Sequence, residues 1–297
     1  MTAVLRARGL EKRFGGVRAV RDVDLTVDVG ERRAILGPNG AGKTTLFGLV
    51  SGSLLPSAGA VELFGRDVTN LSAPRRTRLG LARTFQTSRV FGGLTVEDNL
   101  YLAALGVRGG RLRLVRGRRD AQLREDARRA AARVALDRKL GALASDLSHG
   151  EHRQLEIGLA LAAEPRLLML DEPAAGLSRA ERTLLTELLL SLDRDVTLIL
   201  IEHDMDVALT VAERVTMMHD GRVIVEGLVT TIRSLAEEGV SILLIEQNLG
   251  VATAVARRLL VMLAGRLGHE TTADELLADE DAQQRFLGVA PLAETRA

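Results

Sequence analysis

The sequence predicts an α/β fold with a parallel sheet, because one strand-like apolar run leads into a glycine-rich loop and a helix, and a second ends in a pair of acids. The run from Ala34 to Leu36 is followed by a glycine-rich loop, and a helical pattern begins at Thr45. The run from Leu167 to Leu170 is apolar on both faces and ends in two acids, as buried parallel strands do. Open α/β sheets place their ligands at the carboxyl ends of such strands.

The glycine-rich loop matches the pattern G-x-x-x-x-G-K-[ST] in the strand–loop–helix context that this motif requires. Its glycines let successive backbone N–H groups face one anion, and the following helix adds its positive end. Lys43 is expected to reach the outer phosphates, and the Thr44 hydroxyl to hold Mg²⁺. The alternative is a turn that binds nothing, which this context disfavours. The sequence therefore predicts that the chain binds a nucleoside triphosphate through Gly37, Pro38, Asn39, Gly40, Ala41, Gly42, Lys43 and Thr44.

The two acids after the second run, Asp171 and Glu172, suggest a metal and water site. Asp171 fits the acid that holds Mg²⁺ through water, and Glu172 fits the base that orients the attacking water. A solvated acidic turn is the alternative. The phosphate loop earlier in the chain favours the first interpretation.

Composition limits the classes of protein that remain. The 297 residues allow one large domain or a core with an appendage, and with 46% hydrophobic but 2% aromatic residues the core must consist of Leu, Val, Ile and Ala. There is no cysteine, which excludes a thiolate metal site, and the net charge of +1 gives no reason to expect nucleic acid. We find neither a spanning apolar stretch nor a signal-peptide block, and we expect a soluble protein that reaches a membrane only through a partner.

Three further segments carry a family resemblance. Asp146-Leu147-Ser148-His149-Gly150-Glu151 resembles the signature motif of ATP-binding-cassette (ABC) ATPases, usually written LSGGQ. Thr84-Phe85-Gln86 resembles the Q-loop of the family, and Ile201-Glu202-His203-Asp204 resembles its switch histidine segment. With the phosphate loop and the acidic strand, these motifs follow the order of the family, over roughly residues 3 to 228.

Within that family, the spelling of four segments is most similar to the ATPase subunits of branched-chain amino acid importers. These are Arg13 to Gly16, Ala82 to Gln86, Pro173 to Ser178 and Ile201 to Asp206. The related lipopolysaccharide-export ATPases are the alternative within the fold.

The resemblance implies an α/β P-loop NTPase fold: an ABC cassette with a RecA-like core, an antiparallel β edge and an inserted helical subdomain. The nucleotide-binding core is expected over 1–86 and 161–228, and the helical signature subdomain over 87–160. The cofactors implied are ATP and Mg²⁺.

The resemblance also implies roles for individual residues. Phe14 would stack on adenine, Gln86 would contact Mg²⁺ and the attacking water, and His203 would bridge to the γ-phosphate. The alternatives are a core aromatic, a polar loop residue and a structural histidine. The implied catalytic residues are Glu172, His203 and Gln86; the implied metal ligands are Thr44, Gln86 and Asp171; and Phe14, the loop from Gly37 to Thr44, Thr45, Ser148 and Gly150 would bind the nucleotide.

The signature implies a partner, because in this family Ser148 and Gly150 close over ATP held by another chain. The partners implied are a second ATPase subunit, identical or paralogous, and integral membrane permease subunits docked near Thr87 to Phe91, without nucleic acid. The expected location is the cytoplasmic face of the cell membrane, as a peripheral protein. His149, Glu151 and Ser178 depart from the commonest spelling of the family, and Ser178 replaces the aspartate usual in its D-loop.

An arginine-rich stretch, from Arg108 to Arg138, lies between the Q-loop and the signature. It could form a basic face for anionic lipid. Acids such as Glu125 and Asp126 are interspersed, which favours a solvated helix surface with paired charges.

The last quarter of the chain departs from the family pattern, because it contains an internal repeat. Residues 196–222 align without gaps onto 240–266 at an offset of 44, with twelve of 27 positions identical. His203 becomes Gln247, and Glu246-Gln247-Asn248 resembles the partner ATPase of the same importers. Residues 229–297 are therefore expected to be an α/β tail repeat, a partial copy of a partner cassette. Its strand Ile242 to Ile245 could extend the sheet, pair with another chain, or displace Leu198 to Ile201, and the last arrangement would leave a fusion relic that binds ATP with little turnover.

Overall fold

The computed structural model describes residues 3–84, 90–108, 118–202, 204–228, 258–263, 266–272 and 275–276. The chain divides into two compact units, residues 1–228 and residues 229–297. The strand Ile242 to Ile245 expected in the tail lies outside the described residues.

The first unit is built on a six-stranded sheet with the order β10-β9-β3-β8-β7-β6. The pairs β9·β3, β3·β8, β8·β7 and β7·β6 are parallel, and β10 adds an antiparallel edge to β9. Every residue of β3, β7 and β8 is buried, as expected for parallel strands covered on both faces. The strands are β3 (Arg32–Leu36), β6 (Leu81–Arg83), β7 (Leu167–Asp171), β8 (Thr197–Ile201), β9 (Arg214–His219) and β10 (Arg222–Leu228).

A second, antiparallel sheet has the order β2-β1-β4-β5. Its apolar face shares one buried cluster with helix α1 and with the parallel sheet; Leu5, Phe47 and Met169 are members from the three layers. The helix that follows the glycine-rich loop is thus fixed between two sheets. The elements are β1 (Ala3–Phe14), β2 (Val17–Asp28), β4 (Ala58–Leu63), β5 (Arg66–Asp67) and α1 (Lys43–Ser51).

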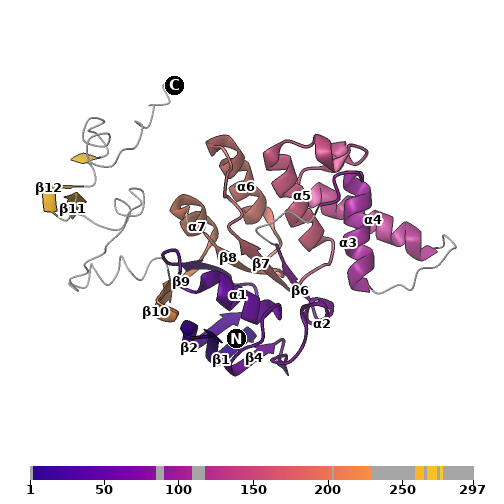
Figure 1. Ribbon diagram of the computed structural model, residues 1–297. Coiled ribbons are helices and arrows are strands. Elements are labelled where there is room, and N and C mark those ends of the chain that lie inside the picture. The colour runs from indigo at the N-terminus through magenta and orange to yellow at the C-terminus, as the bar shows by residue number, and fades with distance from the viewer. Residues whose placement is uncertain are drawn as a thin grey trace. The chain divides into compact units, whose positions relative to one another are not determined.

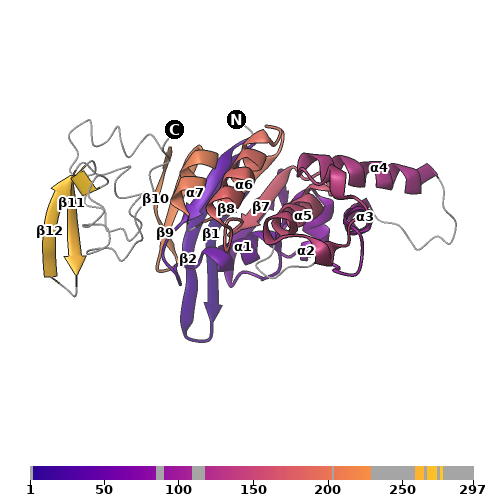
Figure 2. The same cartoon turned by 90° about the horizontal axis from the view of Figure 1, so that it is seen from above.

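Helices α3 (Val96–Arg108), α4 (Arg118–Arg133) and α5 (His149–Leu161) lie together beyond the β6 end of the sheet (Figures 1 and 2). They pack through fully buried side chains such as Leu100, Ala127 and Leu155. The remaining helices are α2 (Ala73–Arg78), α6 (Arg179–Ser191) and α7 (Met205–Val211), with short 3-10 turns at Asp137–Lys139 and Ala144–Asp146.

The arginines of α4 whose side chains are described pair with acids of α3, of α4 and of the segments that follow α5 and α6. Arg128 contacts Glu97 at 3.0 Å, and Arg124 lies 3.5 Å from Asp98 and 3.9 Å from Asp120. This arrangement favours the solvated, charge-paired helix over a lipid-binding face.

The second unit contains one described hairpin, β11 (Arg258–Leu263) with β12 (Arg266–Thr272). Its limits are those of β9 and β10 shifted by 44 residues. The pairing repeats as well: Arg222 lies opposite His219 and Leu228 opposite Arg214, while Arg266 lies opposite Leu263 and Thr272 opposite Arg258. The internal repeat seen in the sequence is therefore also a repeat of backbone structure, and it continues to the end of both hairpins.

Candidate functional site

The glycine-rich loop connects β3 to α1 with left-handed backbone at three glycines, where φ is 143° at Gly37, 82° at Gly40 and 96° at Gly42. A Cβ atom at Gly37 would lie 2.1 Å from the carbonyl oxygen of Met218, and one at Gly42 would lie 2.3 Å from that of Ala19. Only glycine fits these two positions. The close approach of neighbouring backbone explains why the sequence has glycine at both positions.

The loop is also held from outside by the turn between β9 and β10. The Gly221 N–H donates to the carbonyl oxygen of Ala41 at 3.0 Å, and the Gly221 carbonyl accepts from the Arg21 N–H at 2.7 Å. Ala41 is buried, whereas Pro38, Asn39 and Gly40 are exposed. The loop is thus anchored at Ala41, while its outer residues remain accessible to solvent.

Helix α1 begins at a glycine and, within the described part of the chain, has no side-chain cap. Gly42 is its N-cap, and its first turn contains no acidic residue. Thr44 is exposed and Thr45 is half-buried. The N-terminal N–H groups of a helix attract anions, so this end suits a phosphate group.

Lys43 is the charged residue of the loop. It is 5% exposed, and its Nζ donates to the carbonyl oxygens of Gly37 at 2.6 Å and Pro38 at 3.0 Å. Burial lowers the pKa of Lys43, while the nearby carboxylates of Glu172 and Asp171 act in the opposite direction. The structure therefore brings the lysine of the loop close enough to Asp171, at the end of β7, and to Glu172, just after it, for their charges to interact.

Asp171, the last residue of β7, is fully buried. Its Oδ2 accepts from Arg83 at 2.8 Å, and its N–H donates to the Thr84 hydroxyl at 3.2 Å. Its Oδ1 is buried and has no hydrogen-bond partner among the described residues. An orphaned carboxylate oxygen close to a phosphate loop fits a site for a hydrated divalent cation.

Glu172 follows in a left-handed conformation, with φ of 50°. Such a conformation is unfavourable for a residue with a side chain, and it persists only where the surroundings hold it. The Glu172 N–H donates to the carbonyl oxygen of Ile201 at 2.9 Å, and Arg153 of α5 donates to the carbonyl oxygens of Glu172 and Pro173. The turn after β7 is thus fixed by both β8 and α5. A cavity of about 480 Å³ opens beside it, lined by Asp171, Glu172, Arg153, Glu156, His149, His152 and Ala175.

The signature segment forms the N-terminus of α5. The Ser148 hydroxyl accepts from the Glu151 N–H at 3.2 Å, while the Glu151 carboxylate accepts from the Ser148 N–H at 3.0 Å, which is a capping box. The pKa of Glu151 is lowered, mainly by the hydrogen bond that its carboxylate accepts from Lys139 and secondly by the one that it accepts from the Ser148 N–H. Ser148 and His149 are exposed.

Glu181 of α6 connects the signature to the D-loop. Its Oε1 accepts from the Gly150 N–H at 3.0 Å, and its Oε2 accepts from the N–H and the hydroxyl of Ser178 at 2.9 and 2.7 Å. The pKa of Glu181 is lowered, mainly by the hydrogen bond that its carboxylate accepts from the Ser178 hydroxyl. The serine that replaces the usual aspartate is therefore a helix cap in this chain.

Sequence reasoning did not identify Glu181, Arg83 or Arg153. The spacing S-x-x-E from Ser178 to Glu181 was an available signal for the capping box. The other two contacts carry no local signature, because each joins residues distant in the chain.

The other candidate residues are placed in part. Phe14 is 48% exposed at the end of β1, with Lys12 Nζ 5.1 Å from its ring centroid, so it is not a core aromatic. Gln86 and His203 lie outside the described residues. Within the described part of the chain, no helix has the length and apolarity needed to cross a membrane.

Comparison with known proteins identifies the class. A family model described as ABC transporter matches residues 20–175. The chain belongs to this family and is an ATP-binding-cassette ATPase of the kind that drives transport.

The relatives narrow this assignment. LivG of Salmonella typhimurium, a high-affinity branched-chain amino acid transport ATP-binding protein, is 36% identical over 245 residues, covering 78% of this chain and 94% of LivG. BraF of Pseudomonas aeruginosa, which has the same description, is 34% identical over 238 residues, covering 77% of this chain and 93% of BraF. The chain is thus an ABC transporter ATPase subunit homologous to these proteins.

Solved structures agree on the fold. The ADP conformation of MJ1267, an ATP-binding cassette of an ABC transporter, matches with a TM-score of 0.69 and 28% identity, over 77% of this chain and 92% of that one. A nucleotide-free ATP-binding cassette from an ABC transporter matches with a TM-score of 0.68 and 27% identity, over 79% and 95% of the two chains. The predicted cassette fold is confirmed.

Proposed function

We propose that this protein hydrolyses ATP for a branched-chain amino acid importer, working as a peripheral protein on the cytoplasmic face of the membrane. The observation that carries the proposal is the similarity to LivG and BraF over more than nine-tenths of their lengths. The residues at the nucleotide site are compatible with this role.

In the proposed reaction, the loop from Gly37 to Thr44 and the N-terminus of α1 bind the phosphates of ATP, with Thr45 beside them and Phe14 against adenine. Thr44 and Asp171 would hold Mg²⁺, together with Gln86, and Mg²⁺ there would neutralise charge on the phosphate oxygens. Lys43 binds the outer phosphates. Glu172 orients the attacking water and accepts its proton, and His203 aligns the γ-phosphate.

The proposal includes a second ATPase subunit, itself or a paralogue. Ser148 and Gly150 at the start of α5 would close over ATP held by that subunit and stabilise its γ-phosphate with the N-terminus of a helix. The Gly150 N–H now donates to the Glu181 carboxylate. It would have to leave that carboxylate to bind the γ-phosphate, because the two anions compete for the same donor. ATP would then act as a ligand of the closed dimer and stabilise it.

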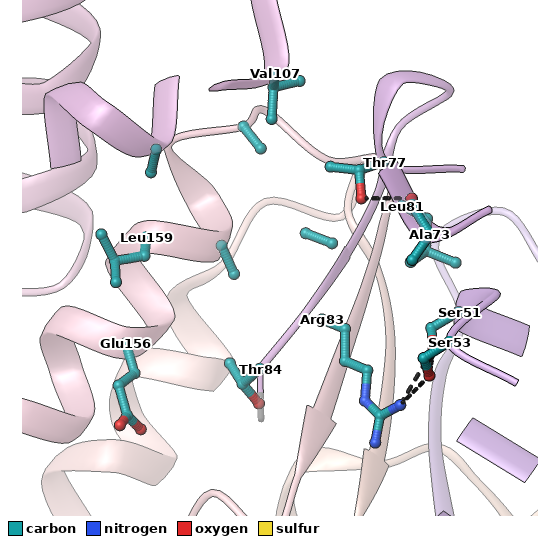
Figure 3. Close-up of a pocket in the computed structure, with 14 residues that line it drawn as sticks. Ser51, Ser53, Ala73, Thr77, Leu81, Arg83, Thr84, Val107, Glu156 and Leu159 are labelled. Carbon is teal, nitrogen blue, oxygen red and sulfur yellow. Dashed lines mark hydrogen bonds between the residues drawn. The ribbon is translucent and has the colours of Figure 1, made fainter. Parts of the chain in front are cut away.

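The membrane permease subunits would dock in the groove between the sheet core and the helical subdomain. The groove has a volume of about 280 Å³, and Figure 3 shows residues of α2 and β6, such as Thr77 and Arg83, on one side of it and residues of α5, such as Glu156, on the other. Its walls are largely apolar, with Leu81, Val107 and Leu159 among the lining residues. We propose the subdomain limits given by the resemblance, 1–86 with 161–228 for the core and 87–160 for the helical part.

The test compares the purified full chain with Glu172→Gln, which keeps the shape of the side chain and removes its basicity. Removing a general base lowers a rate by about 10²–10⁴-fold, so we expect ATPase activity that this change nearly abolishes while ATP binding persists. Uptake of labelled leucine by cells, with and without the gene, then tests the transported solute. Wild-type activity no higher than that of Glu172→Gln would identify the fusion relic, and normal uptake in cells lacking the gene would favour an exporter such as the lipopolysaccharide type.

A further inference from the structure

Arg83, the last residue of β6, reaches across the sheet to the acidic end of β7. Its Nη2 donates to Oδ2 of Asp171 at 2.8 Å, and the two side chains are 9% and 0% exposed. Removing one partner of such a buried ion pair would leave the other charge buried and uncompensated, because water does not reach the site to solvate it.

The same guanidinium is held from the side of α1. Its Nη1 donates to the hydroxyls of Ser51 at 3.1 Å and Ser53 at 3.4 Å, and it lies 5.6 Å from the ring centroid of Phe47. Figure 3 shows Arg83 pointing toward the two serines. The planar fork of arginine can make these contacts at once, which the single ammonium of a lysine cannot.

The two oxygens of Asp171 are therefore distinguished. Oδ2 is bound to Arg83, while Oδ1 is buried without a hydrogen-bond partner among the described residues. The torsion of a carboxylate is soft, so a free Asp171 could present either oxygen in many orientations. Arg83 removes this freedom.

We propose that Arg83 is a positioning residue of the metal site: it holds Oδ2 of Asp171 so that Oδ1 faces the hydrated Mg²⁺ of the bound nucleotide. This inference rests on the Mg²⁺–nucleotide site of the proposed function. Partners that orient a metal-ligating group typically contribute 10-fold to 100-fold to metal affinity. Repulsion between the arginine and Mg²⁺ acts in the opposite direction, and the experiment decides between the two effects.

Arg83 also lines the groove between the core and the helical subdomain. One side chain thus borders both the groove and the acidic end of β7. A ligand in the groove that moved the arginine would change the orientation of Asp171.

The test measures the dissociation constant of ADP for the full chain with Mg²⁺ and with EDTA, by calorimetry and without turnover. For the wild type we expect Mg²⁺ to tighten ADP binding. In Arg83→Met this tightening is expected to fall by about tenfold, while the constant in EDTA stays unchanged, since the loop contacts are intact. Arg83→Lys keeps the charge and is expected to retain part of the tightening.

Arg75→Met is the matched control, because Arg75 is an exposed arginine on α2. It should behave as the wild type. The inference is overturned if Arg83→Met keeps or increases the Mg²⁺ effect, or if it weakens binding equally with Mg²⁺ and EDTA, which would mean a structural role only. A wild type insensitive to Mg²⁺ would instead contradict the metal site of the proposed function, and the inference would fall with it.

Discussion

Two hairpins of this chain, β9–β10 and β11–β12, share one backbone pattern and differ in burial. Each strand begins and ends 44 residues after its counterpart, and the end pairs correspond. Thr216 and Met218 of β9 are fully buried. Leu260 and Met262, at the same positions of β11, are 52% and 63% exposed.

The neighbouring strand accounts for the difference. β9 is paired in parallel with β3, with Ile35 opposite Thr216 and Leu36 opposite Met217, so its inner face lies in the core of the first unit. Among the described residues, β11 pairs only with β12. Local sequence is thus sufficient to specify a hairpin and its register. Burial of both faces requires more than the hairpin itself, since Leu259 and Val261 of β11 are 8% exposed while Leu260 and Met262 on its other face stay open.

The two hairpins also differ in their relation to a nucleotide site, because only the first contacts a glycine-rich loop among the described residues. The turn of the first hairpin bonds to Ala41 through Gly221, and the Met218 carbonyl closes on Gly37. The copy in the tail has the sequence for a hairpin, but the tail has no second phosphate loop for its turn to support.

The largest expected effect is the contrast between Met218→Ala and Met262→Ala. A fully buried methionine replaced by alanine loses about 2–5 kcal/mol of unfolding free energy, because contacts are lost and a cavity remains. An exposed one should cost less than about 0.5 kcal/mol. Urea unfolding of the two full-length variants measures both values. Equal losses would mean that β11 is covered as β9 is.

The second contrast concerns the turn of the first hairpin. Gly221 and Gly65 both lie in hairpin turns with left-handed backbone, at φ of 77° and 76°. Alanine at either position costs about 1–2 kcal/mol of backbone strain. At Gly221 the new Cβ would also lie 2.9 Å from the Ala19 carbonyl oxygen, whereas at Gly65 it meets open space.

We therefore expect Gly221→Ala to be the less stable variant and also to bind ATP more weakly, because its N–H holds the loop at Ala41. Gly65→Ala should lose stability and keep its ATP affinity. Thermal unfolding and titration with a fluorescent ATP analogue measure the two properties. Unaltered ATP affinity in Gly221→Ala would show that the turn does not shape the loop.

The sequence predicted the parts of this molecule whose signals are local. The loop from Gly37 to Thr44, the buried strand ending at Asp171 and the repeat were all found from spacing and periodicity. Sequence identity located the repeat only as far as Arg222 and Arg266, although the pairing continues to Leu228 and Thr272. The register of a hairpin depends on the alternation of apolar and polar residues and on the turn, so it can be kept where the two copies no longer share identical residues.

The parts that escaped prediction are long-range. Arg83 and Asp171 are 88 residues apart, and Gly150 and Glu181 are 31 apart. Nothing in the spacing of such residues indicates that they meet, because the fold of the sheet and of α5 brings them together. The first contact holds Asp171 and the second holds the start of α5. The sequence thus predicted candidate reacting residues and missed the residues that position them.

A smaller effect distinguishes the ends of the two hairpins. After β12, Glu275 accepts from the Thr272 N–H at 3.0 Å and from the Thr271 hydroxyl at 3.2 Å. The Thr272 N–H, as the main cause, lowers the pKa of Glu275 below its ordinary value of 4.5. The first hairpin has Thr231 at the matching position, which offers no carboxylate.

Since the pKa is lowered in the folded state, the stabilisation by Glu275 is complete above pH 4.5 and is lost as the pH falls through the lower folded value. The Thr272 amide resonance should therefore titrate with a midpoint below 4.5, and Glu275→Gln should remove that titration. NMR spectra across this pH range measure it. A midpoint at or above 4.5 would contradict the contact.

The smallest expected effect is that of removing residues 229–297 on ATP turnover. Among the described residues, the buried apolar cluster around α1 and both sheets and the groups at the nucleotide site all belong to the first unit. The truncated chain should thus unfold at the same temperature as the first unit of the full chain and hydrolyse ATP at the same rate. A steady-state ATPase assay compares the two proteins, with Glu172→Gln of each as the blank. A faster truncated chain would mean that the tail inhibits, as it would if Gln247 replaced His203 at the end of the sheet. A slower or unstable one would mean that the tail hairpin completes the core in place of being a surplus copy.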